Sequence, residues 1–205
     1  MKTIFITGAT SGIGLVADSE LVSNGNKVLA TARNVERGNE LIAYYRNNYP
    51  KGKGKIKIIL SDLFSFESIV KACNQVKIEN NCIDVLIDNV GVWNFSYRES
   101  QNNIEETLHV DVLAPLLINY LLLDILSKSN QAKSIFAASA LHQGDIDFSN
   151  LENKEHFSGI NAYRQSKLEV ILLCSLLAKK LASINVAMYC EHPGLVSTKL
   201  GRDAN

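Results

Sequence analysis

The sequence predicts an α/β fold built on a doubly wound parallel sheet with helices on both faces. Three observations predict it. Short β-branched runs alternate with longer helical segments along the whole chain, which is typical of βαβ units. Several of these runs are almost continuously apolar, as expected for strands buried on both faces. A glycine-rich loop also joins the first strand directly to the first helix, a connection that binds phosphates in many α/β proteins.

The pattern places each element in order along the chain. Six strands are expected, at Thr3–Thr7, Lys27–Thr31, Lys55–Leu60, Ile83–Ile87, Ser134–Ala138 and Asn185–Cys190. Five helices are expected between them, at Gly12–Asn24, Val35–Asn48, Phe66–Asn80, Asn102–Ser127 and Asn161–Ser183. No internal repeat, linker or low-complexity segment interrupts this alternation. We therefore expect residues 1–205 to form one domain.

Composition excludes several classes of protein. The chain has 205 residues, 46% of them hydrophobic, which suits one domain with a sizeable core. Its formal net charge is zero, so nothing favours nucleic acid or an anionic membrane as a partner. The four cysteines are scattered, with no Cys-x-x-Cys pair and no histidine at ligand spacing. We expect no disulfide framework, no metal site and a cytoplasmic location.

No segment of the sequence predicts membrane insertion. The N-terminus lacks the pattern of a signal peptide, because Met1 and Lys2 lead at once into a strand and the glycine loop. The most apolar stretch, Val112–Leu126, is interrupted by Pro115, Asn119 and Asp124 and falls short of the ~20 residues that a spanning helix needs. We interpret it as a buried helix and expect no transmembrane segment.

The glycine loop is the first candidate binding site. In Thr7-Gly-Ala-Thr-Ser-Gly-Ile-Gly, Gly8 permits a tight turn, Gly12 lets a pyrophosphate approach the backbone, and Gly14 allows close packing of helix on strand. The helix N-terminus that follows offers free N–H groups and a favourable dipole. Because a strand precedes the loop and a helix follows it, the motif predicts dinucleotide binding.

The end of the second strand bears on which dinucleotide binds. A carboxylate there would hold a ribose 2′-hydroxyl, but the sequence has Arg33 and no acid before Glu36. A guanidinium suits a 2′-phosphate, which favours NADP(H) over NAD(H). The alternative is an arginine that is simply solvated at a strand end.

A tyrosine and a lysine one turn apart form the candidate catalytic pair. Tyr163 and Lys167 lie on one face of the last predicted helix. A phenol carries protons poorly at neutral pH unless a neighbouring positive charge stabilises its anion, and a lysine one turn away can supply that charge. The spacing alone is also compatible with an ordinary surface pair.

Taken together, these motifs resemble the short-chain dehydrogenase/reductase family, in the order in which the family has them. The others are Asp88-Asn-Val-Gly after the fourth strand, Ser139 after the fifth, and the run from Pro193 to Thr198 after the sixth. The segments Ala138-Ser-Ala-Leu-His, Phe148-Ser-Asn-Leu and Glu191-His-Pro-Gly resemble the branch of retinol dehydrogenases and WW-domain oxidoreductases. The resemblance implies a Rossmann-type sheet of strand order 3-2-1-4-5-6.

The resemblance also implies roles for individual residues. Tyr163 would be the general acid/base, Lys167 would lower its pKa and hold the ribose, and Ser139 would hydrogen-bond the reacting oxygen. Read without the family, Ser139 is a strand-end serine, and Asp62 is equally a helix N-cap. The complete cofactor-binding set would be Gly8, Ser11, Gly12, Ile13, Gly14, Arg33, Asp62, Leu63, Asn89, Gly91, Tyr163, Lys167, Pro193, Gly194, Val196 and Thr198. Trp93 and Tyr97 either border the substrate pocket or pack beside it.

The sequence departs from the family pattern in three places. Asp88-Asn-Val-Gly replaces the family's Asn-Asn-Ala-Gly, and Asp111 stands where the family has a fourth catalytic asparagine. The chain also ends at Asn205, so we expect the usual C-terminal substrate loop and seventh strand to be missing.

Two hypotheses from different classes follow. The first is an NADP(H)-dependent oxidoreductase that transfers hydride between nicotinamide and a small carbonyl or alcohol, possibly lipophilic. The alternative is a cofactor-binding but non-catalytic protein that acts through contacts with other proteins. The two long helices resemble those with which family members form dimers, so a homodimer is possible. Assays of NADPH oxidation with a carbonyl panel separate the two hypotheses.

Overall fold

The computed structural model describes residues 1–194, 196 and 200 and contains one six-stranded parallel sheet. Its strand order, β3-β2-β1-β4-β5-β6, confirms the predicted fold class and order. The strands are β1 (Thr3–Ile6), β2 (Lys27–Ala32), β3 (Lys55–Leu60), β4 (Val85–Asp88), β5 (Ala132–Ala137) and β6 (Val186–Glu191). Each starts and ends within two residues of its predicted bounds.

The two central strands set the register of the sheet. In β1, Ile4 pairs with Val28 of β2 on one side and with Val85 of β4 on the other. The side chains of β1 are buried because helices cover both faces of the sheet there. An apolar run without polar alternation therefore forms a strand at this position.

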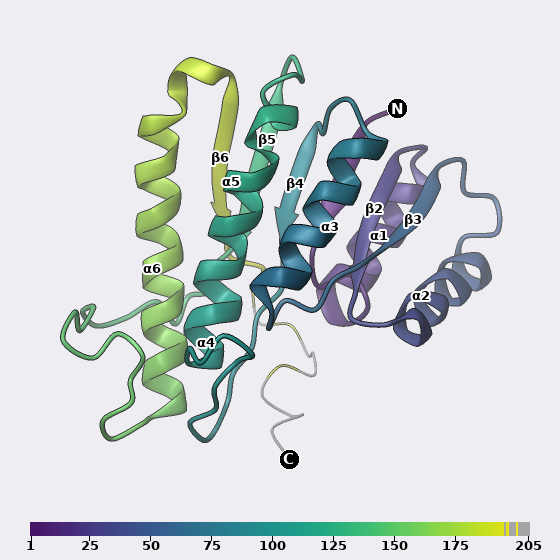
Figure 1. Cartoon of the computed structure of the whole chain (residues 1–205). Helices are drawn as coiled ribbons and strands as arrows, with labels where there is room; N and C mark the ends of the chain where they lie inside the picture. The colour runs from purple at the N-terminus through teal and green to yellow at the C-terminus, as the bar shows by residue number, and fades with distance from the viewer. Residues whose placement is uncertain (195, 197–199, 201–205) are drawn as a thin grey trace.

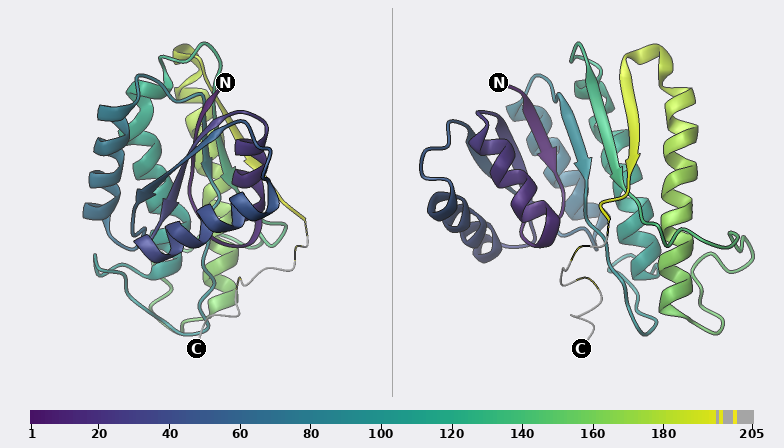
Figure 2. Two further views of the ribbon diagram at one scale, coloured as in Figure 1. Left: turned by 90° about the vertical axis from the view of Figure 1, so that its right-hand side faces the viewer. Right: turned by 180° about the vertical axis from the view of Figure 1, so that it is seen from behind.

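Helices cover the two faces unequally (Figure 1). The helices are α1 (Gly12–Ser23), α2 (Val35–Asn48), α3 (Phe66–Glu79), α4 (Glu106–Leu108), α5 (Ala114–Leu126) and α6 (Gly159–Lys180), with a π-helical turn at His109–Leu113 and a 3-10 turn at Ala182–Ile184. α3, α5 and α6 lie on one face, and α1 and α2 lie on the other. Seen from behind, no helix of the described residues lies over β5 and β6 (Figure 2).

The apolar core has a part on each side of the sheet. One part joins Phe5 and Leu86 to α3 and α5, where Ile69 and Leu122 are fully buried. The other joins Ile4, Ile6 and Val28 to α1 and α2. This two-sided core holds the strands rigidly and leaves the loops at their carboxyl ends free to carry chemistry.

The predicted helix over Asn102–Ser127 is wrong at its start, because the helical segment begins only at Glu106. Asn103 has a positive φ of 57° and belongs to a turn, and the Glu105 carboxylate caps the new helix by accepting from Leu108 N at 2.8 Å. The last helix begins at Gly159 rather than at the predicted Asn161. The first boundary coincides with this local cap, and the second lies where the start of α6 packs on the backbone of Asn94.

One helical segment in the described part of the chain, Glu106–Leu126, is long and apolar enough to cross a membrane. This criterion is weak evidence, because the core helix of a globular domain meets it too. Here Ile118, Leu122 and Leu126 are fully buried against the sheet.

Candidate active site

The carboxyl ends of the parallel strands bring most of the predicted site residues to one edge of the sheet. The glycine loop follows β1, Arg33 follows β2, Asp62 follows β3, Asn89 follows β4 and Ser139 follows β5. Ligands of doubly wound sheets bind at this edge, at the point where the chain reverses its direction across the sheet. In this sheet that point lies between β1 and β4.

Asn89 supports the glycine loop from the neighbouring strand end. Its side-chain amide donates to Thr7 O and Gly8 O, both at 3.3 Å, and its backbone N–H donates to the Thr7 hydroxyl at 3.1 Å. Gly8 has a φ of +66°, which favours glycine, and a Cβ there would lie 2.9 Å from Asn89 Nδ2. A Cβ on Gly14 would lie 2.2 Å from Gly8 O. The glycines therefore allow the close packing that the motif predicts.

The N-terminus of α1 is suited to an anion. Ser11 is the N-cap residue and makes no side-chain capping bond, Gly12 has a φ of +54°, and no acidic residue occupies the first turn. Ser11 and Gly12 are exposed, and Ile13 is half-buried. Free N–H groups at an open, uncharged helix start fit the pyrophosphate of a dinucleotide.

Arg33 and Asp62 lie together at the outer end of this edge. Arg33 Nε is 3.9 Å from Asp62 Oδ1, its guanidinium lies 5.0 Å from the centroid of the Phe64 ring, and its side chain is 65% exposed. The Asp62 carboxylate also accepts from Gln101 Nε2 at 3.0 Å, while the neighbouring Leu63 is buried. The N-cap of α3 is Ser65, so the alternative interpretation of Asp62 as that cap is wrong.

Tyr163 and Lys167 lie near the N-terminal end of α6, and both are buried, with exposed fractions of 5% and 3%. The ammonium of Lys167 lies 5.4 Å from the centroid of the Tyr163 ring and donates to Ala137 O, at the end of β5, at 3.3 Å. Among the described residues no hydrogen bond occupies the Tyr163 hydroxyl. The phenol is thus held beside a cation with its hydroxyl available to a ligand.

Asp111 pairs with Lys167. Asp111 Oδ2 lies 2.9 Å from Lys167 Nζ, and Oδ1 accepts from Val92 N at 2.8 Å. The Ser166 hydroxyl lies 3.3 Å from Oδ2 and donates to Tyr163 O at 2.9 Å. Burial raises the pKa of Asp111, and the nearby Lys167 ammonium and these hydrogen bonds oppose that rise.

The π-helical turn at His109–Leu113 carries Asp111 at this point. Such turns occur within α-helices mostly as single-turn insertions, frequently at functional sites. Gly91 leaves room for the pair, since a Cβ there would lie 3.3 Å from Lys167 Nζ. Neither the turn nor the contribution of Val92 could be predicted from the sequence pattern.

Ser139 lies two residues beyond the end of β5, next to the carbonyl that Lys167 contacts. Its hydroxyl accepts from Leu141 N at 3.1 Å, and its carbonyl lies 2.6 Å from His142 Nδ1. Within the part of the chain that the structure describes, the hydroxyl hydrogen has no acceptor, so it can donate to a substrate oxygen.

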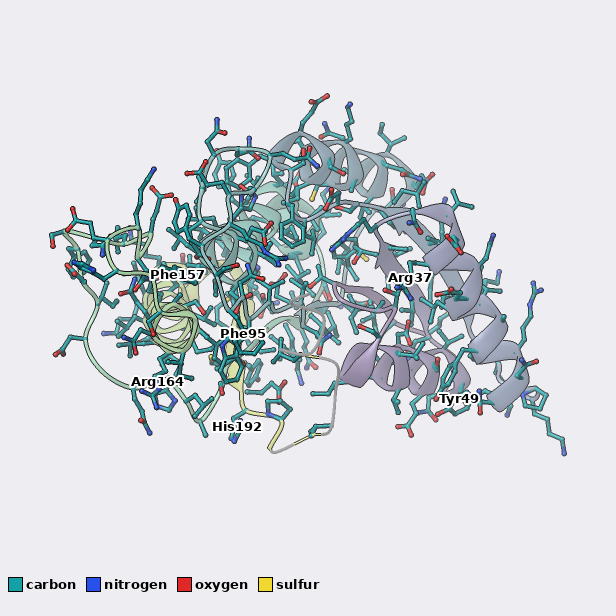
Figure 3. All side chains as sticks on the ribbon, turned by 90° about the horizontal axis from the view of Figure 1, so that it is seen from below. Arg37, Tyr49, Phe95, Phe157, Arg164 and His192 are labelled. Atoms are coloured by element: carbon teal, nitrogen blue, oxygen red, sulfur yellow. The ribbon has the colours of Figure 1, made fainter. Side chains whose placement is uncertain are left out.

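An aromatic side chain covers the phenol. The Trp93 ring stacks on the Tyr163 ring with centroids 5.0 Å apart and an interplanar angle of 12°. Phe95 follows at 6.3 Å from Trp93 and is 65% exposed. Seen from the carboxyl edge of the sheet, Phe95 lies among Phe157, Arg164 and His192 (Figure 3).

The predicted residues after β6 are described in part. Pro193 and Gly194 are exposed, and Gly194 has a φ of +84°. Val196 is 50% exposed, and Thr198 lies outside the described residues. The cofactor-binding roles of this segment therefore stay predictions.

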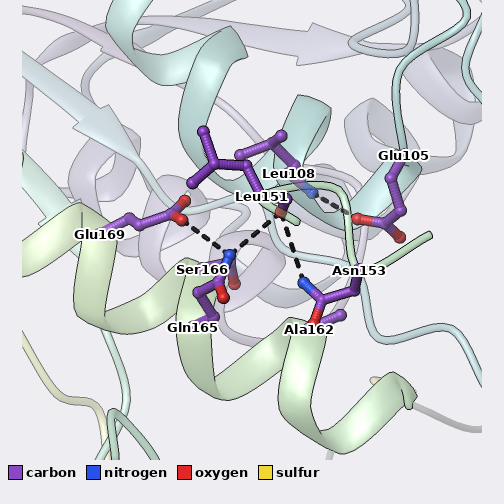
Figure 4. Close-up of a pocket in the computed structure, with 8 residues that line it drawn as sticks. All are labelled: Glu105, Leu108, Leu151, Asn153, Ala162, Gln165, Ser166 and Glu169. Carbon is purple, nitrogen blue, oxygen red and sulfur yellow. Dashed lines mark hydrogen bonds between the residues drawn. The ribbon is translucent and has the colours of Figure 1, made fainter. Parts of the chain in front are cut away.

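A second polar cluster lies on the other side of α6 (Figure 4). Gln165 donates to Leu151 O and to Glu169 Oε1, both at 3.0 Å, and Glu105 Oε2 accepts from Leu108 N. The gap between these groups is too small for a water molecule, so the cluster is packing rather than a ligand site. The described residues contain no group of three His, Cys, Asp or Glu side chains that could hold a metal ion.

Comparison with known proteins agrees with this geometry. The short chain dehydrogenase family model matches residues 2–205, so the chain belongs to the short-chain dehydrogenase family, a family of oxidoreductases. Within it the chain is similar to human retinol dehydrogenase 14, with 32% identity over 213 residues that cover 98% of this chain and 63% of the relative. It is 30% identical to the chicken (Gallus gallus) WW domain-containing oxidoreductase over 94% of this chain and 48% of that protein. The predicted retinol dehydrogenase-like branch is confirmed.

Solved structures share the fold. A Mycobacterium paratuberculosis protein superimposes with a TM-score of 0.81 and 26% identity, over the whole of this chain and 72% of the other. A short-chain dehydrogenase from Sphingobium yanoikuyae in complex with NADPH has a TM-score of 0.79 at 20% identity, over the whole of this chain and 75% of the other. The chain spans 63% of the length of human retinol dehydrogenase 14.

Proposed function

We propose that the protein is an NADP(H)-dependent oxidoreductase that transfers hydride between nicotinamide and a carbonyl or alcohol substrate. The observation that carries the proposal is the hydroxyl of Tyr163, which has no hydrogen-bond partner among the described residues and belongs to a ring beside the Lys167 ammonium. It lies at the same sheet edge as an open glycine loop that fits a dinucleotide pyrophosphate. Family membership and fold neighbours that bind NADPH support it.

Each side chain has a definite task in this proposal. The bound dinucleotide supplies the hydride. Tyr163 Oη passes a proton to the carbonyl oxygen during reduction and takes it back during oxidation. The Ser139 hydroxyl donates a hydrogen bond to the same oxygen. Lys167 places a positive charge beside the phenol, which favours the charged form of the phenol while its proton is away.

The preference for NADP(H) rests on Arg33. Its guanidinium is 65% exposed at the end of β2, and among the described residues it has a long 3.9 Å contact to Asp62 and lies over the Phe64 ring, which leaves its outer N–H groups accessible to a phosphate. A 2′-phosphate would form charge-assisted, bidentate hydrogen bonds with it. NAD(H) lacks that group and gains nothing from Arg33.

The test is NADPH oxidation with a panel of aldehydes, ketones and quinones. We expect turnover by the natural sequence and a loss of at least a hundredfold in kcat for Tyr163→Phe, which removes only the hydroxyl. The dissociation constant of NADPH should stay within about threefold, because the phenol hydroxyl is not needed to hold the pyrophosphate. If Tyr163→Phe turns over at the natural rate, or if NADPH binds without any turnover, the non-catalytic alternative replaces the proposal.

We further propose that two copies associate through α5 and α6 in the cytoplasm. Tyr120 of α5 and Leu172 and Leu176 of α6 are apolar and exposed, at 74%, 51% and 48%. The free thiols of Cys73, Cys82, Cys174 and Cys190 suit a reducing compartment. Analytical ultracentrifugation should find a dimer, and Leu172→Glu should give a monomer.

A further inference from the structure

Trp93 packs directly on Tyr163, the proposed acid/base. Its ring planes are nearly parallel to those of Tyr163, with centroids 5.0 Å apart. Aromatic atoms in contact are about 3.5–4 Å apart, so rings at this centroid distance are offset rather than face to face. Part of the indole face therefore extends past the phenol.

The backbone around Trp93 is held on both sides. Val92 N donates to Asp111 Oδ1 at 2.8 Å. Asn94 is buried, and its side-chain amide donates to Glu106 Oε2 at 2.8 Å. Gly159, at the start of α6, packs so closely on this segment that a Cβ there would lie 1.9 Å from Asn94 O. The backbone that carries the indole is thus held in place. We call the indole ring of Trp93 the wall.

The wall is aromatic and uncharged. Phe95 lies beyond this ring, with its centroid 6.3 Å from that of Trp93 and an interplanar angle of 38°, and it is not part of the wall. The indole N–H is buried and has no acceptor among the described residues, so the side chain offers a ligand only its aromatic face. Flat π-systems stack favourably on such a face, whereas puckered saturated rings do not fit it as closely.

We propose that Trp93 is a specificity-determining residue that selects carbonyl substrates with a flat, aryl or conjugated substituent. A carbonyl oxygen that accepts from Tyr163 Oη places its substituent along the overhanging indole. A planar substituent stacks on the indole ring, and a substituent with sp³ branching clashes with it. The inference rests on the proposed function and names its substrate class.

Kinetics with a matched pair of aldehydes tests the selection. Benzaldehyde and cyclohexanecarbaldehyde share a carbon skeleton, and only the first is flat. The ratio of kcat/KM for benzaldehyde to kcat/KM for cyclohexanecarbaldehyde is compared between variants. This comparison removes the effect of the different intrinsic reactivities of the two aldehydes. We expect Trp93→Ala to shift that ratio at least tenfold toward cyclohexanecarbaldehyde, mainly through KM, and Trp93→Phe to shift it less than threefold.

Phe95→Ala is the matched control, because Phe95 lies on the same segment and makes no ring contact with Tyr163. It should leave the ratio within about threefold of the natural value. An unchanged ratio in Trp93→Ala, or an equal shift in Phe95→Ala, overturns the proposal while leaving the oxidoreductase function intact.

A binding experiment tests the wall without turnover. Trp93 is the sole tryptophan of the chain, so its fluorescence reports this position alone. With NADP⁺ present, we expect saturable quenching by benzamide and at least tenfold weaker quenching by cyclohexanecarboxamide. Tyr163→Phe should keep this difference. Equal responses to the two amides, or no response to either, overturn the proposal, and a selective response upholds it even if the protein proves inactive.

Discussion

The carboxylate of Asp111 lies 2.9 Å from the ammonium of Lys167, and both side chains are almost completely shielded from water. The same carboxylate accepts from Val92 N, so one residue joins the π-helical turn, α6 and the segment after β4. Buried ion pairs contribute little net stability when intact, but removing one partner leaves a costly unpaired charge.

Two substitutions at Asp111 should therefore behave differently. Asp111→Asn keeps an acceptor for Val92 N, and we expect kcat/KM to stay within about tenfold, or ~1.4 kcal/mol of barrier. Asp111→Ala should lower the free energy of unfolding by about 3–5 kcal/mol, because Lys167 is left buried without its partner. Steady-state kinetics and urea unfolding measure the two effects. A gain far beyond tenfold in Asp111→Asn would mean that the carboxylate suppresses activity.

Replacing Arg33 should change cofactor choice. We expect Arg33→Ala to weaken NADP⁺ binding about tenfold by calorimetry and to leave NAD⁺ binding within twofold, since a charge-assisted bond to phosphate is worth roughly 1.5–3 kcal/mol at most. Arg37→Ala is the matched control, because Arg37 is an exposed arginine of α2 that pairs with Glu40 (Figure 3). Equal affinities of the natural protein for NADP⁺ and NAD⁺ would contradict the assignment of Arg33.

Glu169 should make the protein less stable as pH rises. Burial raises the pKa of Glu169 to about 7, although Gln165 donates a hydrogen bond to it. The folded state therefore keeps a proton that the unfolded state releases near its ordinary pKa of ~4.3. The contribution of Glu169 to the free energy of unfolding is complete below that pH, falls as pH rises toward 7 and is constant above about pH 7.

Glu169→Gln should remove this slope and raise the free energy of unfolding at pH 8 by up to about 3 kcal/mol, with little effect at pH 4. Urea unfolding at the two pH values measures it. Glu67→Gln is the contrasting control, because Lys71 lowers the pKa of Glu67 and so gives it a dependence of the opposite sign. A pH-independent effect of Glu169→Gln would show that the group titrates normally.

Asp88 should also make the protein less stable as pH rises, over a higher pH range than Glu169 does. Burial raises the pKa of Asp88 to about 8, although Asn119 donates to it at 2.6 Å. Asp88→Asn restores the amide that the family has here and keeps an oxygen for Asn119. We expect a higher midpoint of thermal unfolding at pH 9 and a smaller change at pH 6. A lower midpoint of thermal unfolding for Asp88→Asn at pH 9 would contradict the raised pKa of Asp88.

Local sequence pattern was sufficient for the sheet and for the conformation of the glycine loop. The apolar run from Thr3 and the spacing of Gly8, Gly12 and Gly14 act over a few residues, so both were predicted correctly. The pairing of Asp111 with Lys167 could not be predicted from local pattern, since 56 positions separate them in the chain. Helix starts were less predictable, because Glu105 N is held by the distant Glu152 carboxylate at 3.0 Å and Gly159 packs on the backbone of Asn94.

The stacking of Trp93 on Tyr163 could not be predicted from the sequence either, because it depends on contacts that form only in the folded chain. The two rings are 70 positions apart in the chain, and their contact depends on how α6 packs against the segment after β4. From the sequence, a wall of the substrate pocket and simple packing beside it were equally compatible with a tryptophan at this position.

The close approach of Gly159 to Asn94 has a mechanical consequence. The first residue of α6, one turn before Tyr163, rests directly on the backbone next to Trp93, with no side chain between them. A displacement of one must therefore displace the other by a similar amount. We therefore expect Tyr163 and Trp93 to move together as one unit, so that the space beside them changes when side chains are exchanged rather than when the two segments separate.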